Sequence, residues 1–244
     1  MKTKITLIKL GHVGHLVDFE KLKKWKSNLF EIVEIQCVEH LPNSTIEDGY
    51  YDQKYSVEDL KGKISCPKTS DIAVSIMMDR FIDNFYMHRV GSNCAALSLY
   101  RIPEILSIKD ISIENFIIRQ LYEICAFNLY YTFSDEVYEF VHRDTRGCLF
   151  DMNGDRTDIL HNTEKPIICE ACRGKLKTKQ INADTINLFE KELKKIEKPL
   201  IQKIERCIKK YPFVSMFISA IVSAIIAIGI NEIIHIIREI IYSI

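Results

Sequence analysis

An uncharged apolar segment in the C-terminal part of the sequence is the feature that most restricts the fold. Residues 212–230 read PFVSMFISAIVSAIIAIGI, nineteen residues without a charged side chain. At a rise of about 1.5 Å per residue, a helix of this length spans roughly 28 Å, close to the roughly 30 Å hydrocarbon core of a bilayer. A helix buried in a soluble core is rarely apolar on every face at this length. We therefore predict one transmembrane helix over residues 212–230.

The charges on either side of this segment predict its orientation. Eight basic residues precede it and only Arg238 follows it; the eight are Lys191, Lys194, Lys195, Lys198, Lys203, Arg206, Lys209 and Lys210. The positive-inside rule then places the N-terminal domain in the cytoplasm. The chain has eight cysteines, and residues 1–10 lack the apolar run of a secretory signal, so we expect a strand there and a reducing compartment.

The segments next to the membrane helix are amphipathic. Residues 184–210 predict a basic helix with Asp184 as its cap and a kink at Pro199, which either docks on the domain as a linker or forms a stalk that lies on lipid or self-associates. Residues 231–244 place isoleucines on one face and polar residues on the other. They form either an interfacial helix on the far leaflet or a continuation of the membrane helix that lines an oligomeric path. The S-x3-S and A-x3-A spacings within 212–230 favour a homo-oligomer.

Two pairs of soft metal ligands lie in the region before these helices. His142 and Cys148 form an H-x5-C pair, and Cys169 and Cys172 form a C-x2-C pair. Two short-spaced pairs joined by a longer loop are what a closed tetrahedral zinc site requires, and four protein ligands leave no position for a reactive water. The sequence therefore predicts a structural zinc, with His161 competing with His142 for the fourth position.

The remaining cysteines show no ligand-like spacing, and we expect them to be core or surface thiols; they are Cys37, Cys66, Cys94, Cys125 and Cys207. The formal net charge is zero, which gives no argument for nucleic-acid binding. No glycine-rich phosphate loop or nucleophile elbow is present.

The N-terminal part of the chain alternates strands and helices. We predict strands at 5–11, 30–42, 71–78 and 93–102, and helices at 18–30 and, capped by Ser56, at 56–64; 43–55 is polar and turn-rich. Residues 111–133 have apolar residues at helical spacing and predict a buried central helix. This order indicates an α+β or mixed α/β domain over 1–177, followed by the 184–210 stalk helix, the transmembrane helix and the 231–244 helix.

The order of these features resembles the archaemetzincin family of zinc metallopeptidases. The resemblance covers roughly residues 4–177: a first strand running into LGHVG, YDQKYSVEDL before the third strand, ALSLYRI, the long helix, a downstream Cys and the final C-x2-C. It implies a metzincin-like domain with two zinc ions. In the family, three His of a motif that begins H-E-x-x-H hold the catalytic zinc, the Glu of the motif is the general base, and four Cys hold a second zinc.

The chain departs from this family pattern at the catalytic motif. Tyr122, Glu123 and Ala126 stand where the family has the first His, the Glu and the second His, so Glu123 is the only retained motif position. Two imidazoles one helical turn apart are what a catalytic zinc needs. We interpret His142 as replacing the first Cys of the structural site, and the domain as a pseudopeptidase without catalytic residues.

Three other groups of residues have plainer interpretations. His12 and His15 form an H-x2-H pair that we expect to be solvated. The tyrosines Tyr122, Tyr130, Tyr131 and Tyr138 are expected to pack in the core. The acidic residues Asp144, Asp151, Asp155 and Asp158 are expected to form a solvated turn around the zinc ligands.

These features together predict a membrane-anchored sensor or effector. Its zinc domain would bind an unknown cytoplasmic ligand or protein partner, and its C-terminal helices would oligomerise in or perturb membrane lipid. Bacterial defence systems use the same layout, which suggests antiviral defence by analogy alone. The alternatives are a membrane-bound zinc peptidase with a rebuilt active site, and a passive membrane-anchored scaffold.

Overall fold

The computed structural model describes residues 2–41, 44, 46–48, 52–134, 136–196, 205 and 208–242. It divides the chain into two compact units, Met1–Glu197 and Lys198–Ile244. The first unit extends past residue 177, because two further helices belong to it. Pro199 and Cys207, which carried predictions above, lie outside the described residues, as does the last residue of the strand predicted at 30–42.

The first unit is built on a five-stranded, mostly parallel sheet, which makes it a mixed α/β domain. The strand order is β2 (Phe30–Val38), β1 (Thr3–Leu10), β5 (Ile72–Met77), β8 (Cys94–Ser98) and β7 (Met87–Gly91). Every neighbouring pair is parallel except β7 with β8. The predicted strands at 5–11, 30–42, 71–78 and 93–102 are confirmed as β1, β2, β5 and β8, whereas β7 was not predicted.

Side chains of the central strands alternate between two apolar layers. On β1, Ile5 and Leu7 face the larger core, whereas Ile8 and Leu10 face the smaller one. The smaller core is closed by α2 (Val57–Leu60) and a three-stranded sheet of β3 (Ile46–Asp48), β4 (Asp52–Tyr55) and β6 (Arg80–Phe81). Burial on both faces explains why these parallel strands are nearly continuous apolar runs.

The short elements α2, β3, β4 and α1 (Phe19–Lys23) differ in how well their sequences predict them. Ser56 caps α2, as predicted, and the structure shows that the cap is a capping box with Asp59. The polar stretch 43–55 was predicted as turns, but among its described residues it contains β3 and β4. The helix predicted over 18–30 is short: α1 covers Phe19–Lys23, and strand β2 begins at Phe30.

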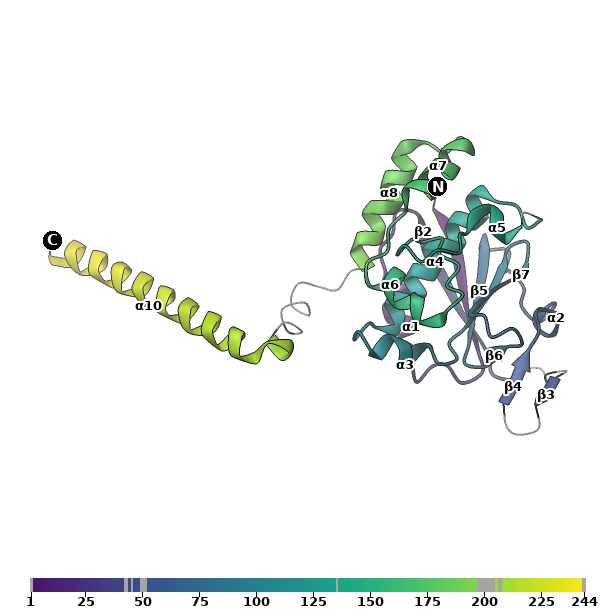
Figure 1. Ribbon diagram of the computed structural model, residues 1–244, viewed down its shortest axis with the longest axis horizontal. Coiled ribbons are helices and arrows are strands. Elements are labelled where there is room, and N and C mark those ends of the chain that lie inside the picture. Colours follow the sequence, from purple (N-terminus) through teal and green to yellow (C-terminus); the bar gives the residue numbers. More distant parts are fainter. Residues whose placement is uncertain are drawn as a thin grey trace. The chain divides into compact units, whose positions relative to one another are not determined.

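Helix α4 (Ile113–Tyr130) is the central helix of the larger core, as predicted. It begins at the Ser112 cap, and most of its residues are buried. It is contacted by α1, α3 (Ile102–Ser107), α6 (Ile159–Glu164) and α8 (Ala183–Leu193). Figure 1 shows α4 lying against the sheet inside this group of helices. The unit is completed by α5 (Val137–Phe140), α7 (Glu170–Thr178) and the 3-10 turns η1 (Arg156–Asp158) and η2 (Lys194–Ile196).

Helix α8 docks on the domain through a buried carboxylate. Glu192 is 1 % exposed and accepts a hydrogen bond from the Tyr122 hydroxyl at 2.8 Å. It also accepts from the backbone amide and the side-chain amide of Asn28, each at 3.2 Å, and from Lys195 Nζ at 2.5 Å. Residues 184–196 therefore dock on the domain, which is the first of the two interpretations given above for 184–210.

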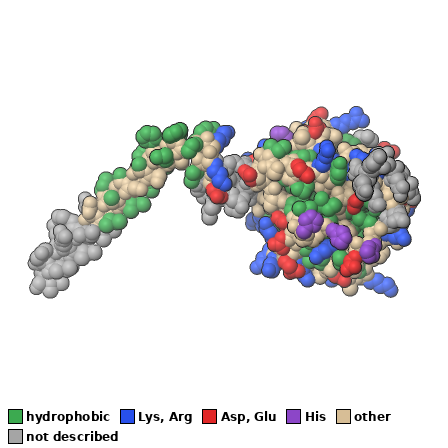
Figure 2. Space-filling model, turned by 90° about the horizontal axis from the view of Figure 1, so that it is seen from below, with side chains coloured by type: hydrophobic (Ala, Val, Ile, Leu, Met, Phe, Trp, Pro, Cys, Tyr) green, Lys and Arg blue, Asp and Glu red, His purple; other side chains and the backbone are tan. Residues whose placement is uncertain are grey.

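The second unit contains one long helix, α10 (Pro212–Tyr242). Its segment Pro212–Asn231 has a mean hydropathy of 2.5 and is not buried within the structure, so it is long and apolar enough to cross a membrane. Figure 2 shows hydrophobic side chains along the described part of this helix. The backbone continues as helix through residues 231–242, and both interpretations of the C-terminal segment, an interfacial helix and a continued membrane helix, stay predictions.

Removing Glu192 tests the docking of α8. We expect Glu192→Ala to lower the free energy of unfolding by about 3 kcal/mol, because the Tyr122 hydroxyl and the Asn28 amide lose a buried acceptor. Glu190→Ala on the same helix is the control, since Glu190 pairs with Arg173 at the partly exposed surface; it should cost less than about 1 kcal/mol. Chemical denaturation measures both, and equal losses would contradict the buried role of Glu192.

Candidate metal centre

A short backbone pairing brings the two predicted half-sites together. The amide of Leu149 donates to the carbonyl of Ile167 at 2.7 Å, and the amide of Ile167 donates to the carbonyl of Gly147 at 3.0 Å. Gly147 has a φ of 72°, which a residue with a side chain adopts only with strain. This turn aims Cys148 inward, next to the segment that carries the C-x2-C pair.

The second half-site begins a helix, and the histidine is held by its own loop. Cys169 is the N-cap residue of α7, and Cys172 lies in its first turn. The amide of His142 donates to the carbonyl of Phe150 at 3.1 Å, and the His142 carbonyl accepts from the amide of Met152 at 3.0 Å. Both contacts fix the loop that presents the imidazole.

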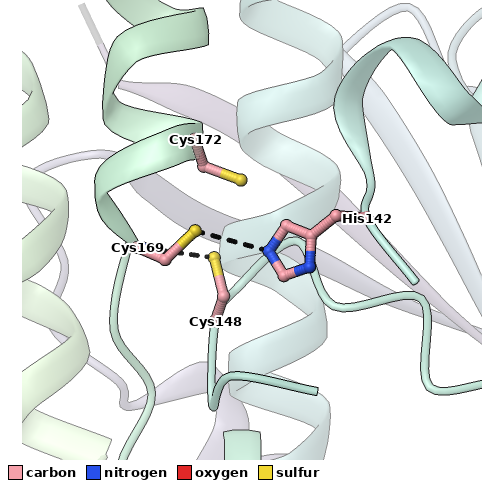
Figure 3. A group of neighbouring side chains, drawn as sticks. All are labelled: His142, Cys148, Cys169 and Cys172. Atoms are coloured by element: carbon pink, nitrogen blue, oxygen red, sulfur yellow. Dashed lines mark hydrogen bonds between the residues drawn. The ribbon is translucent and has the colours of Figure 1, made fainter. Parts of the chain in front are cut away.

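The four predicted ligands converge. The ligand atoms of His142, Cys148, Cys169 and Cys172 all lie within 4.8 Å of one another, and the four side chains point toward a common centre (Figure 3). His142 Nε2 is 3.4 Å from Cys169 Sγ. Three sulfurs and one imidazole nitrogen are a common ligand set of structural zinc sites, and this group can hold a zinc ion.

Contacts around the ligands suit metal binding. His142 Nδ1 donates a 2.8 Å hydrogen bond to the carbonyl oxygen of Asp144, which leaves Nε2 as the nitrogen that faces the sulfurs. The amides of Phe150 and Cys169 each donate to Cys148 Sγ at 3.4 Å. Amide donors of this kind stabilise a thiolate, the form in which cysteine binds zinc.

The electrostatics of the three thiols also favour a cation. A hydrogen bond from Cys172 and the two amides lower the pKa of Cys148 to about 5. The neighbouring Cys148 and burial raise the pKa of Cys172 above its usual range. One thiolate therefore opposes the ionisation of the next, and a divalent cation at the centre removes this repulsion.

The structure separates the two candidate histidines. His142 belongs to the group, whereas His161 lies exposed on α6 and outside it. His12 and His15 are exposed as well. Within the described part of the chain, no second set of three or more His, Cys, Asp or Glu side chains comes together in this way.

Asp151 is a site residue that sequence reasoning missed. It was predicted to lie in a solvated turn, but it is 1 % exposed, so that prediction is wrong for Asp151. Its Oδ2 accepts from the amides of Cys148 at 2.9 Å and Arg146 at 3.1 Å, and its Oδ1 lies 3.4 Å from His142 Nε2. The other three acidic residues are exposed or partly exposed. Only the spacing of Asp151, three residues after Cys148, gave a signal of its role.

The residues aligned with the catalytic motif are all buried in α4. The ring of Tyr122 packs against Phe30 and Phe189, while Ala126 is 2 % exposed. Glu123 forms an ion pair with Arg119 of the same helix. Burial raises the pKa of Glu123 to about 7 even though the guanidinium favours its carboxylate form. Of the other tyrosines, Tyr131 is buried and Tyr130 partly buried, and the side chain of Tyr138 is not described.

Fold and site together define a mixed α/β domain with a His/Cys3 metal site. No family model and no curated protein matches the chain. Among solved structures it is similar to the archaemetzincin from Methanopyrus kandleri, with 12 % identity, a TM-score of 0.49, and coverage of 73 % of this chain and 96 % of that one. It is also similar to the archaemetzincin from Archaeoglobus fulgidus complexed with malonate, with 12 % identity, a TM-score of 0.46, and coverage of 70 % and 99 %.

Substituting the two histidines tests the ligand set. We expect His142→Ala to weaken zinc binding by more than about 100-fold, because it removes a ligand, while His161→Ala changes the affinity by less than about twofold. Competition with a chromophoric chelator measures both affinities. The double variant Cys169→Ser/Cys172→Ser should lose zinc and melt at a lower temperature. Equal effects of the two histidine variants would contradict the assignment.

Substituting Asp151 tests the residue behind the ligands. Asp151→Asn keeps the size of the side chain but removes its charge, so we expect zinc affinity to fall by about 10- to 100-fold. Asp155→Asn is the matched control, since Asp155 is exposed and caps η1. If the two variants bind zinc with the same affinity, Asp151 has no role in the site.

Proposed function

We propose that this protein is a membrane-anchored zinc protein that acts as a sensor or effector. Its domain would resemble an archaemetzincin that has lost the catalytic metal, and its C-terminal helices would assemble in, or perturb, the bilayer. The observation that carries this proposal is the uncovered apolar segment Pro212–Asn231 on a chain whose other unit contains a His/Cys3 site.

The exposed side chains of α10 support membrane insertion. Phe213, Met216 and Phe217 are 77, 69 and 74 % exposed, and the isoleucines from Ile218 to Ile230 are exposed as well. Monomeric soluble proteins rarely leave an apolar patch of this extent in water. A bilayer removes that cost and leaves the backbone hydrogen bonds of the helix satisfied.

The flanking charges and the cysteines support a cytoplasmic domain. Eight basic residues precede the span and one follows it, as the positive-inside rule requires for this orientation. The three thiols of the metal group are free. A thiolate-based zinc site is most stable in a reducing compartment, where its cysteines do not oxidise to disulfides.

The surroundings of Glu123 support the loss of peptidase activity. Tyr122 and Ala126 offer no metal ligand on the helix where the family carries two imidazoles, and both are packed in the core. Glu123 is held by Arg119, so its carboxylate has a counterion in place of a metal-bound water. A role in antiviral defence rests on the arrangement of domain and membrane helix alone.

Reconstitution in dye-loaded liposomes tests the effector function. The full chain should resist alkaline extraction and release dye increasingly as the protein-to-lipid ratio rises. Deleting residues 231–244 should leave the membrane-bound fraction unchanged and lower dye release severalfold, because the span remains while the polar face is lost. A chain that inserts but releases no dye at any ratio would be a passive anchor. Peptide cleavage that depends on Glu123 would identify a peptidase.

A further inference from the structure

A cavity lies between the edge strand β7 and helix α4, beside the loop of the metal centre. Its volume is about 420 Å³, within the range of roughly 300–1,000 Å³ that small-molecule sites occupy. Its lining is mostly apolar, with residues from β7, from α4 and from the segment around Asp151. The metal ligands themselves do not line it.

The apolar walls of the cavity are aromatic. Among the described lining residues, five phenylalanine and tyrosine rings contribute, from Phe85, Tyr86, Phe127, Phe133 and Phe140. Their ring faces carry negative potential and attract cations. The structure already contains one such contact at the rim, where the Arg89 guanidinium lies 4.9 Å from the centre of the Phe133 ring. Arg89 is held there by a 2.7 Å hydrogen bond to the carbonyl of Thr132.

The charged groups of the cavity are mainly carboxylates. Glu123 and Asp151 line its interior, each 1 % exposed, and Asp83 lies at the more exposed rim. Arg89 is the only Lys or Arg among the described lining residues, with His88 beside it. Asp151 Oδ1 makes no hydrogen bond. Carboxylates therefore outnumber Lys and Arg among the described lining residues, although Glu123 has Arg119 behind it in α4 and Asp83 lies 3.0 Å from His88 Nε2.

Burial disfavours the ionised form of Glu123 even though Arg119 pairs with it. Arg119 pairs with it from within α4, yet burial still raises the pKa of Glu123 to about 7. A second positive charge on the cavity side would stabilise the ionised form. An anion in the same place would meet two buried carboxylates.

We propose that the cavity binds a hydrophobic organic ammonium compound, with its charged nitrogen at Glu123 and its apolar body among the five rings. This inference rests on the proposed function, since it names the class of ligand that the sensor would detect. Neutral apolar compounds lack the carboxylate interaction, and anions of the same shape are excluded by charge.

The position of the cavity explains how a bound ligand affects the metal centre. Asp151 lines the cavity and also accepts from the amide of Cys148. Arg119 pairs with Glu123 and also donates to the carbonyls of Cys148 and Leu149. A ligand that moves either carboxylate therefore acts on the backbone that presents Cys148.

Calorimetric titration of the full chain in detergent tests the proposal with three probes of similar shape. These are 2-phenylethylammonium, 2-phenylethanol and 3-phenylpropanoate, used at about pH 8, where the amine is protonated and Glu123 is ionised. We expect the ammonium to bind at least about tenfold more tightly than the alcohol, and the anion more weakly than either. Equal binding of ammonium and alcohol, tighter binding of the anion, or binding of none of the three would overturn the proposal.

Two variants locate the binding site. Glu123→Gln should weaken ammonium binding at least about tenfold. Glu164→Gln is the control, because Glu164 lies on α6 and pairs with Lys109; it should leave binding unchanged. Because Glu123→Gln leaves Arg119 buried without its counterion, Phe133→Leu provides a second test at a side chain that is 49 % exposed. This variant keeps apolar area but removes the ring face, and binding should fall by about three- to tenfold. Unchanged binding in both variants would overturn the assignment of the site.

The outcomes separate this inference from the proposed function. Dye release without any ammonium binding would leave the effector standing and reject the cavity as its ligand site. Ammonium binding that depends on Glu123, in a chain that never releases dye, would keep the binding site and reject the effector.

Discussion

The buried guanidinium of Arg119 connects the main parts of the domain. It is the largest fully buried side chain in the described structure and comes from the middle of the central helix. Its charge is balanced by Glu123, and it donates to the carbonyls of Cys148 and Leu149. A buried cation needs such partners, so the helix and the metal loop must keep one arrangement, even though the Nε of this guanidinium makes no hydrogen bond. This gives Glu123 a structural reason to be present without any imidazole beside it.

The loop that carries the metal ligands gathers negative potential, as Arg119 gathers positive charge. Three thiols, one imidazole and the carboxylate of Asp151 lie close together with little exposure to water. Amide donors and Arg119 offset part of this negative potential, and a divalent cation would offset the rest. The loop has little regular structure of its own, with α5, η1 and α6 each six residues or shorter. A bound ion would therefore hold this loop together in addition to the buried apolar side chains, such as Leu149 and Phe150, that the loop contributes to the larger core.

Sequence patterns predicted the elements whose formation depends on a single local signal, such as an apolar run, a helical period or a cap. β1, β5 and α4 were predicted because each is a long apolar run or a helical period, and Ser56 because its cap is local. The four metal ligands were found by spacing, but the choice between His142 and His161 needed the fold of the loop. β7 was missed because, as an edge strand, it is only partly buried and mixes polar and apolar residues. Asp151 and Glu192 were missed because burial of a carboxylate depends on partners far away in sequence.

The measurement that tests the central claim most directly is zinc-edge X-ray absorption on the purified full chain, together with its metal-to-protein ratio. One zinc per chain with three sulfur ligands at about 2.3 Å and one nitrogen at about 2.0 Å is the predicted result. It would place the ion in the His142 and three-cysteine group and leave α4 without metal. A second zinc with only nitrogen and oxygen ligands would contradict this account, because it would require a catalytic metal that the residues of α4 do not provide.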